Sequence, residues 1–430
     1  MQSTFRRIEA TVAAVVLVVA AFSTGLPYLF YLLYLGLLVA GGSYVVTRLG
    51  LADLEAGYAV NRLAGHVGDE LRVTYTVRNV GRLPKPWLEL YNPTDLPSGI
   101  PGRAIAVGGR RERSWAVRVP LTERGTFDID PLVVRTADPF GLFESTASVG
   151  RGVALTVYPR IDPIPHWRLP AANLEGTHAH PERTLQTTPL ATAVRPWAPG
   201  DSFNRIHWRS TARRGELLVK EFELERTADV WIALDLDEAV QAGRDDRSTV
   251  EVGIRVVAAI AHEALEENRA VGMSLNVRGG AGGAMRGGRP RHASLLPADR
   301  GGRQRSKVMQ LLAAADGDGD APFAETLIAT VPRLRQGMTL VAVTPSFDRT
   351  WVRPLALLRS RGVATVVVLL DQLSFLEDAA ARSEPRIEVP AGEGEALADA
   401  QRMLRHELAE HGIRVHRVGP GDPLAEALAR

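Results

Sequence analysis

Three arginines at four-residue spacing, Arg205, Arg209 and Arg213, are the residues of this chain best suited to bind an anion. They lie in the stretch VRPWAPGDSFNRIHWRSTARRGELLVKEFELE, residues 194–225, which is called the signature segment below. In a helix, steps of four residues advance only about 40° around the axis, so the three guanidinium groups form one stripe. A guanidinium group binds a carboxylate or a phosphate through two parallel hydrogen bonds. The spacing therefore indicates a surface for a partner's carboxylates or a phosphate.

A short helix and the strand after it must position these arginines. Asp201 is placed to cap a helix and Gly215 is typical of a helix end, which together predict a helix over about 202–214. The residues after it alternate between apolar and polar, which predicts a strand with Leu218 on its apolar face. Lys220 falls on the same face of that strand.

The alternative is a structural role for the same arginines. They are able to pair with Glu221, Glu223 and Glu225 on the following strand, while Asp201 or another acid neutralises Lys220. Exposed ion pairs contribute only about 0 to 1 kcal/mol each, so stability alone is a weak reason to gather so many charges. We interpret the segment as an internally paired hinge between two domains whose outer edge meets a partner.

Several motifs resemble those of a bacterial protein family, domain of unknown function 58. The signature segment supplies PGD, I-x-W, S/T-A-R and L-x-V-K-E-F-E, and upstream stand RGTF (124–127), DPFGLF (138–143) and VYPR (157–160). The resemblance covers the chain from about Gly68 onward, and the biochemical activity of the family is largely undefined. It implies a membrane-anchored protein with a β-rich domain, a von Willebrand factor A-like domain, and a MoxR-type AAA ATPase as its partner. The signature positions expected to contact a partner are Asp201, Arg205, Trp208, Arg209, Arg213, Lys220 and Glu221.

A group of oxygen-bearing residues follows two predicted strands, at 230–236 and 338–343. Ligands of open α/β sheets bind at the carboxyl ends of strands. In a von Willebrand factor A-like domain, D-x-S-x-S at such an end holds a hard divalent cation. Here Ala239 takes the last position without a side-chain oxygen, so we expect a degenerate site that is vacant or binds Mg²⁺ weakly. Capping of the next helix by the aspartates is the structural alternative. The candidate ligands are Asp235, Asp237, Thr344 and Asp348.

The sequence lacks the common catalytic motifs. No H-E-x-x-H, G-x-S-x-G or G-x-x-x-x-G-K-[ST] occurs, which removes the main support for a metalloprotease, a serine hydrolase or a P-loop ATPase. The run DGDGD (316–320) resembles a calcium loop but has Ala321 and Leu327 where that loop needs glycine and an acid. With no cysteine in the chain, disulfides and thiolate chemistry are excluded. The alternative function is a divalent-metal-dependent hydrolase that uses the strand end at Asp235.

The N-terminus is apolar enough for a membrane. No residue between Glu9 and Arg48 is charged, and a single helix of that length would far exceed the hydrocarbon core of about 30 Å. A break near 23–27 therefore predicts two spanning helices, at about Ala10 to Phe22 and Tyr28 to Val46. A signal peptide is the competing interpretation, but a small-residue cleavage site is lacking. Arginines flank the pair on its outer sides, so the positive-inside rule places both ends in the cytoplasm, at the inner membrane.

The patterns divide the chain into four parts. We expect a transmembrane hairpin at 1–50, a β-sandwich at 59–160, a linker with the signature segment at 161–228, and an α/β domain at 229–430. Alternating polarity predicts the sandwich. Apolar runs between amphipathic segments predict the last part to be a doubly wound sheet of the von Willebrand factor A-like type.

Charge adds little to this assignment. The net charge of +2 over 430 residues gives no reason to expect nucleic acid, and the Gly/Arg-rich run at 278–291 is interpreted as a mobile surface loop. We expect a membrane-anchored, non-enzymatic protein-interaction module. Its partner, by the family resemblance, is a MoxR-type AAA ATPase in an assembly, chaperone-like or envelope-related process.

Overall fold

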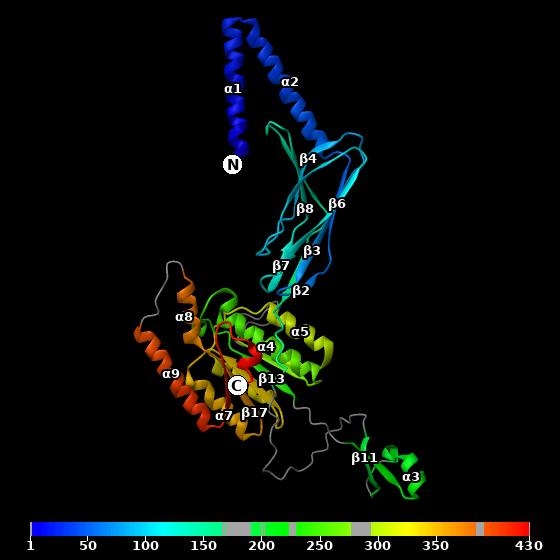
Figure 1. Cartoon of the computed structure of the whole chain (residues 1–430), viewed down its shortest axis with the longest axis vertical. Helices are drawn as coiled ribbons and strands as arrows, with labels where there is room; N and C mark the ends of the chain where they lie inside the picture. The colour runs from blue at the N-terminus through cyan, green and yellow to red at the C-terminus, as the bar shows by residue number, and fades with distance from the viewer. Residues whose placement is uncertain are drawn as a thin grey trace, which may run out of the picture. The chain divides into compact units, whose positions relative to one another are not determined.

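The computed structural model divides the chain into two compact units (Figure 1). Unit 1 comprises Met1–Ile161 with Met309–Ala314, and unit 2 comprises Asp162–Val308 with Ala315–Arg430. The side chains at 2–10, 191–193, 205, 220–222, 391 and 393 lie outside the described part of the chain. The structure describes residues 2–165, 167, 191–198, 201, 203–222, 229–276, 294–383 and 391–429.

Two helices begin unit 1, α1 (Gln2–Thr24) and α2 (Pro27–Gly50), and both are longer than the helices predicted there. Gly25 between them has a φ of 68°, a left-handed conformation that suits glycine. The rings of Phe22 and Phe30 meet edge to face at 5.5 Å beside this turn. Within the described residues, only α2 is long and apolar enough to cross a membrane. The second span stays a prediction.

The rest of unit 1 is β-rich, as predicted for 59–160. Three sheets enclose one hydrophobic core, with strand orders β1-β3-β6, β2-β10-β7 and β5-β4-β8-β9. In β3, the predicted alternation places Leu71, Val73, Tyr75 and Val77 in the core. The strands are β1 (Leu54–Val60), β2 (Ala64–His66), β3 (Glu70–Asn79), β4 (Lys85–Tyr91), β5 (Arg103–Val107), β6 (Glu112–Pro120), β7 (Gly125–Ile129), β8 (Leu132–Ala137), β9 (Glu144–Val149) and β10 (Val153–Tyr158).

Unit 2 contains a six-stranded sheet in the order β15-β14-β13-β16-β17-β18. Numbered along the chain this order is 3-2-1-4-5-6, which is typical of doubly wound α/β folds. The neighbouring strands are parallel except for β15, which is antiparallel to β14. The mixed α/β organisation that was predicted is therefore confirmed. The strands are β13 (Val230–Leu234), β14 (Val271–Leu275), β15 (Ser294–Asp299), β16 (Thr339–Thr344), β17 (Ala364–Leu370) and β18 (Arg414–Val418).

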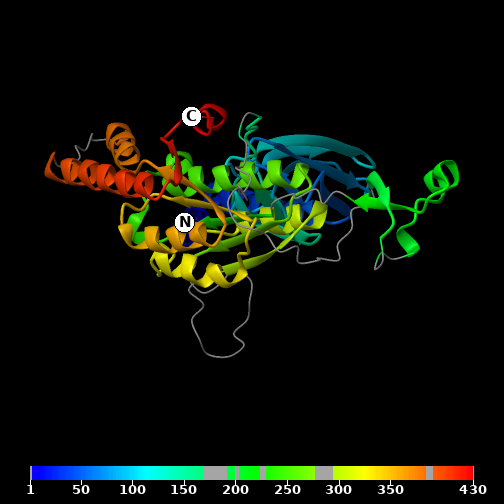
Figure 2. The same cartoon turned by 90° about the horizontal axis from the view of Figure 1, so that it is seen from below.

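Helices cover both faces of this sheet, and Figure 2 shows α4 and α7 on opposite sides. Successive strand residues point to opposite faces. Trp231 and Ala233 pack in a core with α6, α7 and α9, whereas Leu234 lies against Gly253 of α4 on the other face. Buried on both sides, these strands read as continuous apolar runs. The helices are α4 (Thr249–Glu266), α5 (Gly301–Ala313), α6 (Phe323–Thr330), α7 (Val352–Ser360), α8 (Gln372–Arg382), α9 (Ala391–Glu410) and α10 (Leu424–Ala427).

The packing of Trp231 depends on a glycine in the neighbouring strand. Gly272 is paired with Trp231 across β13 and β14, and a methyl group at Gly272 would overlap the indole ring. The indole also donates a hydrogen bond from Nε1 to Ser274 Oγ at 3.1 Å. The ring therefore cannot shift without losing a buried hydrogen bond.

We predict that Gly272→Ala destabilises unit 2 by about 1–3 kcal/mol, because overpacking a dense core forces side chains and backbone to move. The measurement is urea unfolding of the full chain in detergent, followed by tryptophan fluorescence. Gly302→Ala is the matched control, since nothing lies within 4 Å of the added methyl group on α5. Equal unfolding midpoints for the two variants would contradict the prediction.

Candidate functional site

The sheet of unit 2 has one point where the strand order reverses, between β13 and β16. From β13 the chain proceeds first to β14 on one side and later to β16 on the other. The carboxyl ends of strands at such a switch point are where open α/β sheets bind ligands. Asp235 follows directly after β13, and Thr344 ends β16. Two of the four predicted oxygen-bearing residues therefore meet at this point.

Both oxygens of the Asp235 carboxyl group accept hydrogen bonds from neighbouring strand ends. Thr344 Oγ1 donates to Oδ2 at 2.6 Å, and Asn276 Nδ2 donates to Oδ1 at 3.0 Å. The backbone N–H of Asp237 also donates to Oδ1, at 3.2 Å. The side chain is only 1% exposed. One carboxyl group thus joins the ends of β14, β13 and β16.

The loop that holds the DGDGD run lies across these strand ends. Gly319 accepts a hydrogen bond from Glu238 N and donates one to Leu236 O, both at 2.9 Å. A methyl group at Gly319 would come within 2.5 Å of the Asn276 carbonyl oxygen, so only glycine allows this close approach. The acidic run therefore covers the strand ends through its backbone.

Burial raises the pKa of the Asp235 carboxyl from 3.8 to about 6. The hydrogen bonds from Thr344 and Asn276 act in the opposite direction, because they stabilise the charged form. A buried carboxyl group of this kind is costly unless its oxygens are satisfied. The surrounding donors therefore stabilise the arrangement of the strand ends.

The two other predicted metal ligands cap short helical turns. Asp237 accepts from Ala239 N at 3.1 Å at the start of η2 (Glu238–Val240). Asp348 accepts from Thr350 N at 3.1 Å at the start of η5 (Arg349–Trp351). Within the described residues no group of three or more His, Asp or Glu is arranged to hold a metal ion. The residues present do not fit a Mg²⁺ site, because the Asp235 oxygens already face protein donors.

Sequence reasoning missed three polar residues of this edge. Asn276 links Asp235 to the covering loop, since its Nδ2 also donates to Ala321 O at 2.9 Å. Gln241 Nε2 donates to the Asp235 carbonyl oxygen at 3.1 Å. Asp371, 2% exposed after β17, accepts from Gln401 Nε2 at 3.0 Å and pairs with Arg417. Asn276 and Asp371 each follow a buried strand, which is the signal that pointed to Asp235.

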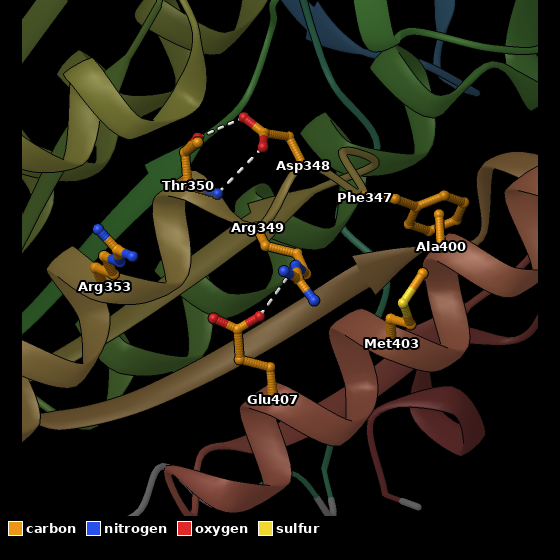
Figure 3. A pocket seen from close by; sticks show the side chains of 8 residues that line it. All are labelled: Phe347, Asp348, Arg349, Thr350, Arg353, Ala400, Met403 and Glu407. Atoms are coloured by element: carbon orange, nitrogen blue, oxygen red, sulfur yellow. Dashed lines mark hydrogen bonds and ion pairs between the residues drawn. The ribbon is translucent and has the colours of Figure 1, made fainter.

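A solvent-accessible cavity of about 550 Å³ lies beside Asp348 at the carboxyl end of β16. Its volume falls within the usual range of ligand pockets, about 300–1,000 Å³. Figure 3 shows Asp348 turned toward Thr350 and Arg349 toward Glu407 of α9, with an Nε to Oε2 distance of 3.2 Å. The lining residues are Phe347, Asp348, Arg349, Thr350, Arg353, Ala400, Met403 and Glu407.

The chemistry of this cavity suits binding of an anionic group with an apolar flank. Both acids are engaged by neighbours, while Arg353 is exposed and forms no ion pair within the part of the chain that the structure describes. Met403, 55% exposed, supplies apolar surface. Among the lining residues, the Thr350 hydroxyl donates to the Asp348 carboxylate, and the same carboxylate caps η5.

The signature segment forms a small module of its own. The strands β11 (Ala191–Pro196) and β12 (Leu218–Phe222) pair as an antiparallel hairpin. Between them stand η1 (Phe203–Arg205) and α3 (Trp208–Arg214). These elements are called the signature module below. Residues 223–228, with Glu223 and Glu225, lie outside the described part of the chain, as do the side chains of Arg205, Lys220 and Glu221.

The predicted helix over 202–214 is interrupted, and α3 begins only at Trp208. The cause is Ile206, which is 3% exposed and forms a β-bridge with Val219. This bridge also buries Val219, which the alternating pattern had placed on the polar face. Gly215 ends the helix with a φ of 73°, as predicted. The prediction that three arginines form a stripe on one helix is therefore wrong for Arg205, because this residue precedes the start of α3.

Asp201 has a different role from the predicted helix cap. Its carboxylate accepts two hydrogen bonds from the Arg195 guanidinium, each at 2.7 Å, and one from Ala198 N at 3.0 Å. The cap of α3 is His207, whose Nδ1 accepts from Ser210 N at 3.2 Å. Asp201 therefore ties the turn to β11, which fixes the start of the module.

The surface of the module combines aromatic and basic side chains. Phe203 and Trp208 are each 66% exposed. Arg209 and Arg213 are exposed and stand one turn apart on α3. The predicted contact residues that the structure describes with side chains are thus Asp201, which is partly exposed and bonded within its own turn, and three exposed residues of α3: Trp208, Arg209 and Arg213.

One further prediction falls outside the described residues, namely that the Gly/Arg-rich run at 278–291 is a surface loop.

A comparison with known protein families finds a match that includes the signature segment. Residues 193–375 match the family model described as protein of unknown function DUF58. The uncharacterized protein YeaD of Bacillus subtilis (strain 168) is 26% identical over 256 residues, which cover 57% of this chain and 61% of YeaD. The match therefore spans less than two thirds of the length of that relative.

Solved structures show only weak likeness. The CARDB domain of a Pyrococcus furiosus protein has 13% identity and a TM-score of 0.19, covering 24% of this chain and 92% of that one. A β-glucosidase from Listeria innocua in complex with isofagomine has 12% identity and a TM-score of 0.17, covering 24% and 16%. TM-scores this low support no conclusion on fold or activity.

We predict that Asp235 makes the stability of unit 2 depend on pH. Its folded-state pKa, about 6, lies above the ordinary value of 3.8, so the folded protein binds more protons between these values. The free energy of unfolding therefore loses on the order of 1–3 kcal/mol as the pH rises through the folded-state pKa. Asp235→Asn, which stays neutral, removes this loss. Urea unfolding at about pH 5 and about pH 7.5 measures it, and Asp237→Asn is the control. Parallel pH dependence in wild type and Asp235→Asn would contradict the assignment.

We also predict that Mg²⁺ leaves the melting temperature of the full chain unchanged, because the Asp235 oxygens face protein donors. A ligand at 100 times its dissociation constant stabilises a protein by about 2.7 kcal/mol, which a thermal scan detects easily. A rise in melting temperature that is present in wild type and lost in Asp235→Asn would instead establish a metal site and favour the hydrolase alternative.

Proposed function

We propose that this protein is a membrane-anchored, non-enzymatic interaction module whose partner is a MoxR-type AAA ATPase. The observation that carries the proposal is the outer face of the signature module, with Trp208 and Phe203 largely exposed beside Arg209 and Arg213. Tryptophan and arginine are the side chains most enriched at the hot spots of protein interfaces. The choice of an ATPase partner rests on the family resemblance of the signature segment.

The carboxyl edge of unit 2 supports binding better than catalysis. The Asp235 carboxyl group is used within the fold, and the neighbouring cavity has acids that are already bonded to Thr350 and Arg349. A catalytic site needs a base within hydrogen-bond reach of a nucleophile or a metal. In the cavity, the Asp348 carboxylate accepts from the Thr350 hydroxyl within a helix-capping turn, and the remaining open surface consists of Arg353 and apolar side chains. It suits an acidic segment of a protein partner.

The architecture and the location complete the proposal. We propose a von Willebrand factor A-like fold for unit 2, supported by the 3-2-1-4-5-6 strand order and by Asp235 at its switch point. We further propose that α1 and α2 both span the inner membrane, with units 1 and 2 otherwise on the cytoplasmic side. The apolar length of α2 and the arginine at its end, Arg48, support this orientation.

The test is recovery of the ATPase with the full chain from detergent-solubilised membranes. Loss of a hot-spot residue costs about 2 kcal/mol or more, so Trp208→Ala and the double variant Arg209→Glu with Arg213→Glu should weaken binding roughly 30-fold. The matched control is Arg335→Glu, another exposed arginine of unit 2. Raised salt should also reduce recovery, because the attraction is between exposed charges. Absence of an ATPase with the wild type, or equal recovery with all variants, would refute the proposal.

A further inference from the structure

The last turn of α2 is fixed to the β-rich domain by specific contacts. Lys85 Nζ, at the start of β4, donates a hydrogen bond to the Leu49 carbonyl oxygen. This satisfies one of the carbonyl groups that every helix leaves free at its end. Gly50 lies against Thr136 of β8, where an added methyl group would come within 2.7 Å of Thr136 Cγ2. The strands β4 and β8 therefore stand next to the end of the apolar helix.

The DPFGLF motif forms the tip of the β8–β9 hairpin beside α2. Asp138 is 5% exposed, and its carboxylate accepts from Phe140 N at 2.9 Å and from Phe143 N at 2.6 Å, which fixes the loop. The Phe143 ring meets Tyr44 of α2 edge to face at 5.7 Å. Phe140, in contrast, is 61% exposed. Figure 1 shows this hairpin rising along α2.

A second loop, between β3 and β4, exposes apolar side chains at the same end of the domain. Val80 N donates to Asp53 O at 2.9 Å, close behind α2, and Asn79 Nδ2 donates to Leu83 O at 2.8 Å. These bonds hold Val80 and Leu83 in place, although the two side chains are 43% and 59% exposed. Exposed apolar side chains that are gathered at one end of a domain mark an interaction surface.

Exposed arginines accompany these apolar side chains. Arg48 stands in the last turn of α2 and Arg82 in the loop between β3 and β4. Arg110 N donates to Gly81 O at 2.8 Å, which places Arg110 and Arg111 next to that loop. Among the residues with described positions, none of these four arginines forms an ion pair. Arginines beside apolar side chains are suited to the interface of an anionic membrane.

The length of α2 places this end of the domain at the membrane surface. Its 24 residues span about 36 Å, whereas the hydrocarbon core is about 30 Å thick. Tyr44 lies six residues before Gly50, so Phe143 meets the helix about 9 Å from its end. If the helix spans the bilayer, its last turns and the loops packed on them lie in the headgroup region.

We propose that this end of the β-rich domain is a second membrane-contact surface. Phe140 and Leu83 enter the interfacial layer of the bilayer, and Arg82, Arg110 and Arg111 bind the phosphates of anionic lipids. The domain is thereby held against the bilayer in one orientation. This inference rests on the membrane anchoring through α2 proposed above.

The test uses the full chain reconstituted in vesicles of phosphatidylcholine and phosphatidylglycerol. Because the chain has no cysteine, single cysteines carry an environment-sensitive fluorophore. Lipids with nitroxide labels quench it, placed near the headgroup for residues 140 and 123 and deep in the acyl chain for residue 38, which lies at the middle of α2. The labelled variants are Phe140→Cys at the surface, Leu38→Cys within α2, and Glu123→Cys as the control. Glu123 lies beyond the other end of β6, roughly 30 Å from the proposed surface by strand length.

Quenching of the labels at residues 38 and 140, with the label at 123 unaffected, supports the inference. Quenching at 38 alone would overturn it and leave the anchoring through α2 intact. Lack of quenching at 38 would overturn both the inference and the anchoring. Charge reversal at Arg82 and Arg111 to Glu should reduce quenching at 140, whereas Arg118→Glu, an exposed arginine toward the other end of β6, should not. Equal quenching in both charge variants would exclude the role of the arginines.

Discussion

The buried side chain of Asp235 needs hydrogen-bond donors, and this need determines how the C-terminal ends of the strands in unit 2 are arranged. Asp235 lies where the strand order reverses, and almost none of it reaches solvent. Such a group is costly to bury unless donors surround it. Thr344 and Asn276 supply these donors from the two neighbouring strands. The Asp235 side chain thus joins the ends of three strands. Asn276 extends this link to the covering loop, because it also donates to Ala321 O.

The same constraint limits what this edge is able to do. A carboxylate that accepts three hydrogen bonds from the protein has little capacity left for a metal ion. The open chemistry of unit 2 lies instead at its surface, in the cavity beside Arg353 and on the outer face of α3. Both places combine arginine with apolar side chains. That combination is chemically suited to acidic protein segments, which supports the interaction role proposed above.

The elements that the sequence predicted best are those in which one local pattern decides the outcome. The buried strands of unit 2 are continuous apolar runs, and β3 alternates strictly between core and solvent. Predictions failed where a distant contact overrides the local pattern. Ile206 interrupts the expected helix because it pairs with Val219, which is 13 positions later in the chain. The edge strand β15 was not predicted, because it contains Pro297 and shows little alternation.

The candidate site shows the same division between local and distant effects. Asp235 was identified because it follows a buried strand, a property of adjacent residues. The choice between ligand and cap for Asp237 and Asp348 depends on which N–H group each carboxylate meets, and both meet the backbone two residues later. Such short-range capping is the usual behaviour of aspartate after a strand.

The DPFGLF motif illustrates how a local bond and a distant helix act together. Asp138 shapes the loop by binding two backbone N–H groups, and this alone would leave both phenylalanines in water. Packing of Phe143 on Tyr44 links the loop to α2, while Phe140 gains no such cover within unit 1. Exposure of a large ring on a rigid loop has a cost in water that contact with a bilayer removes. The position of the loop beside the apolar helix α2 therefore explains why the motif keeps Phe140 exposed, which the loop alone does not explain.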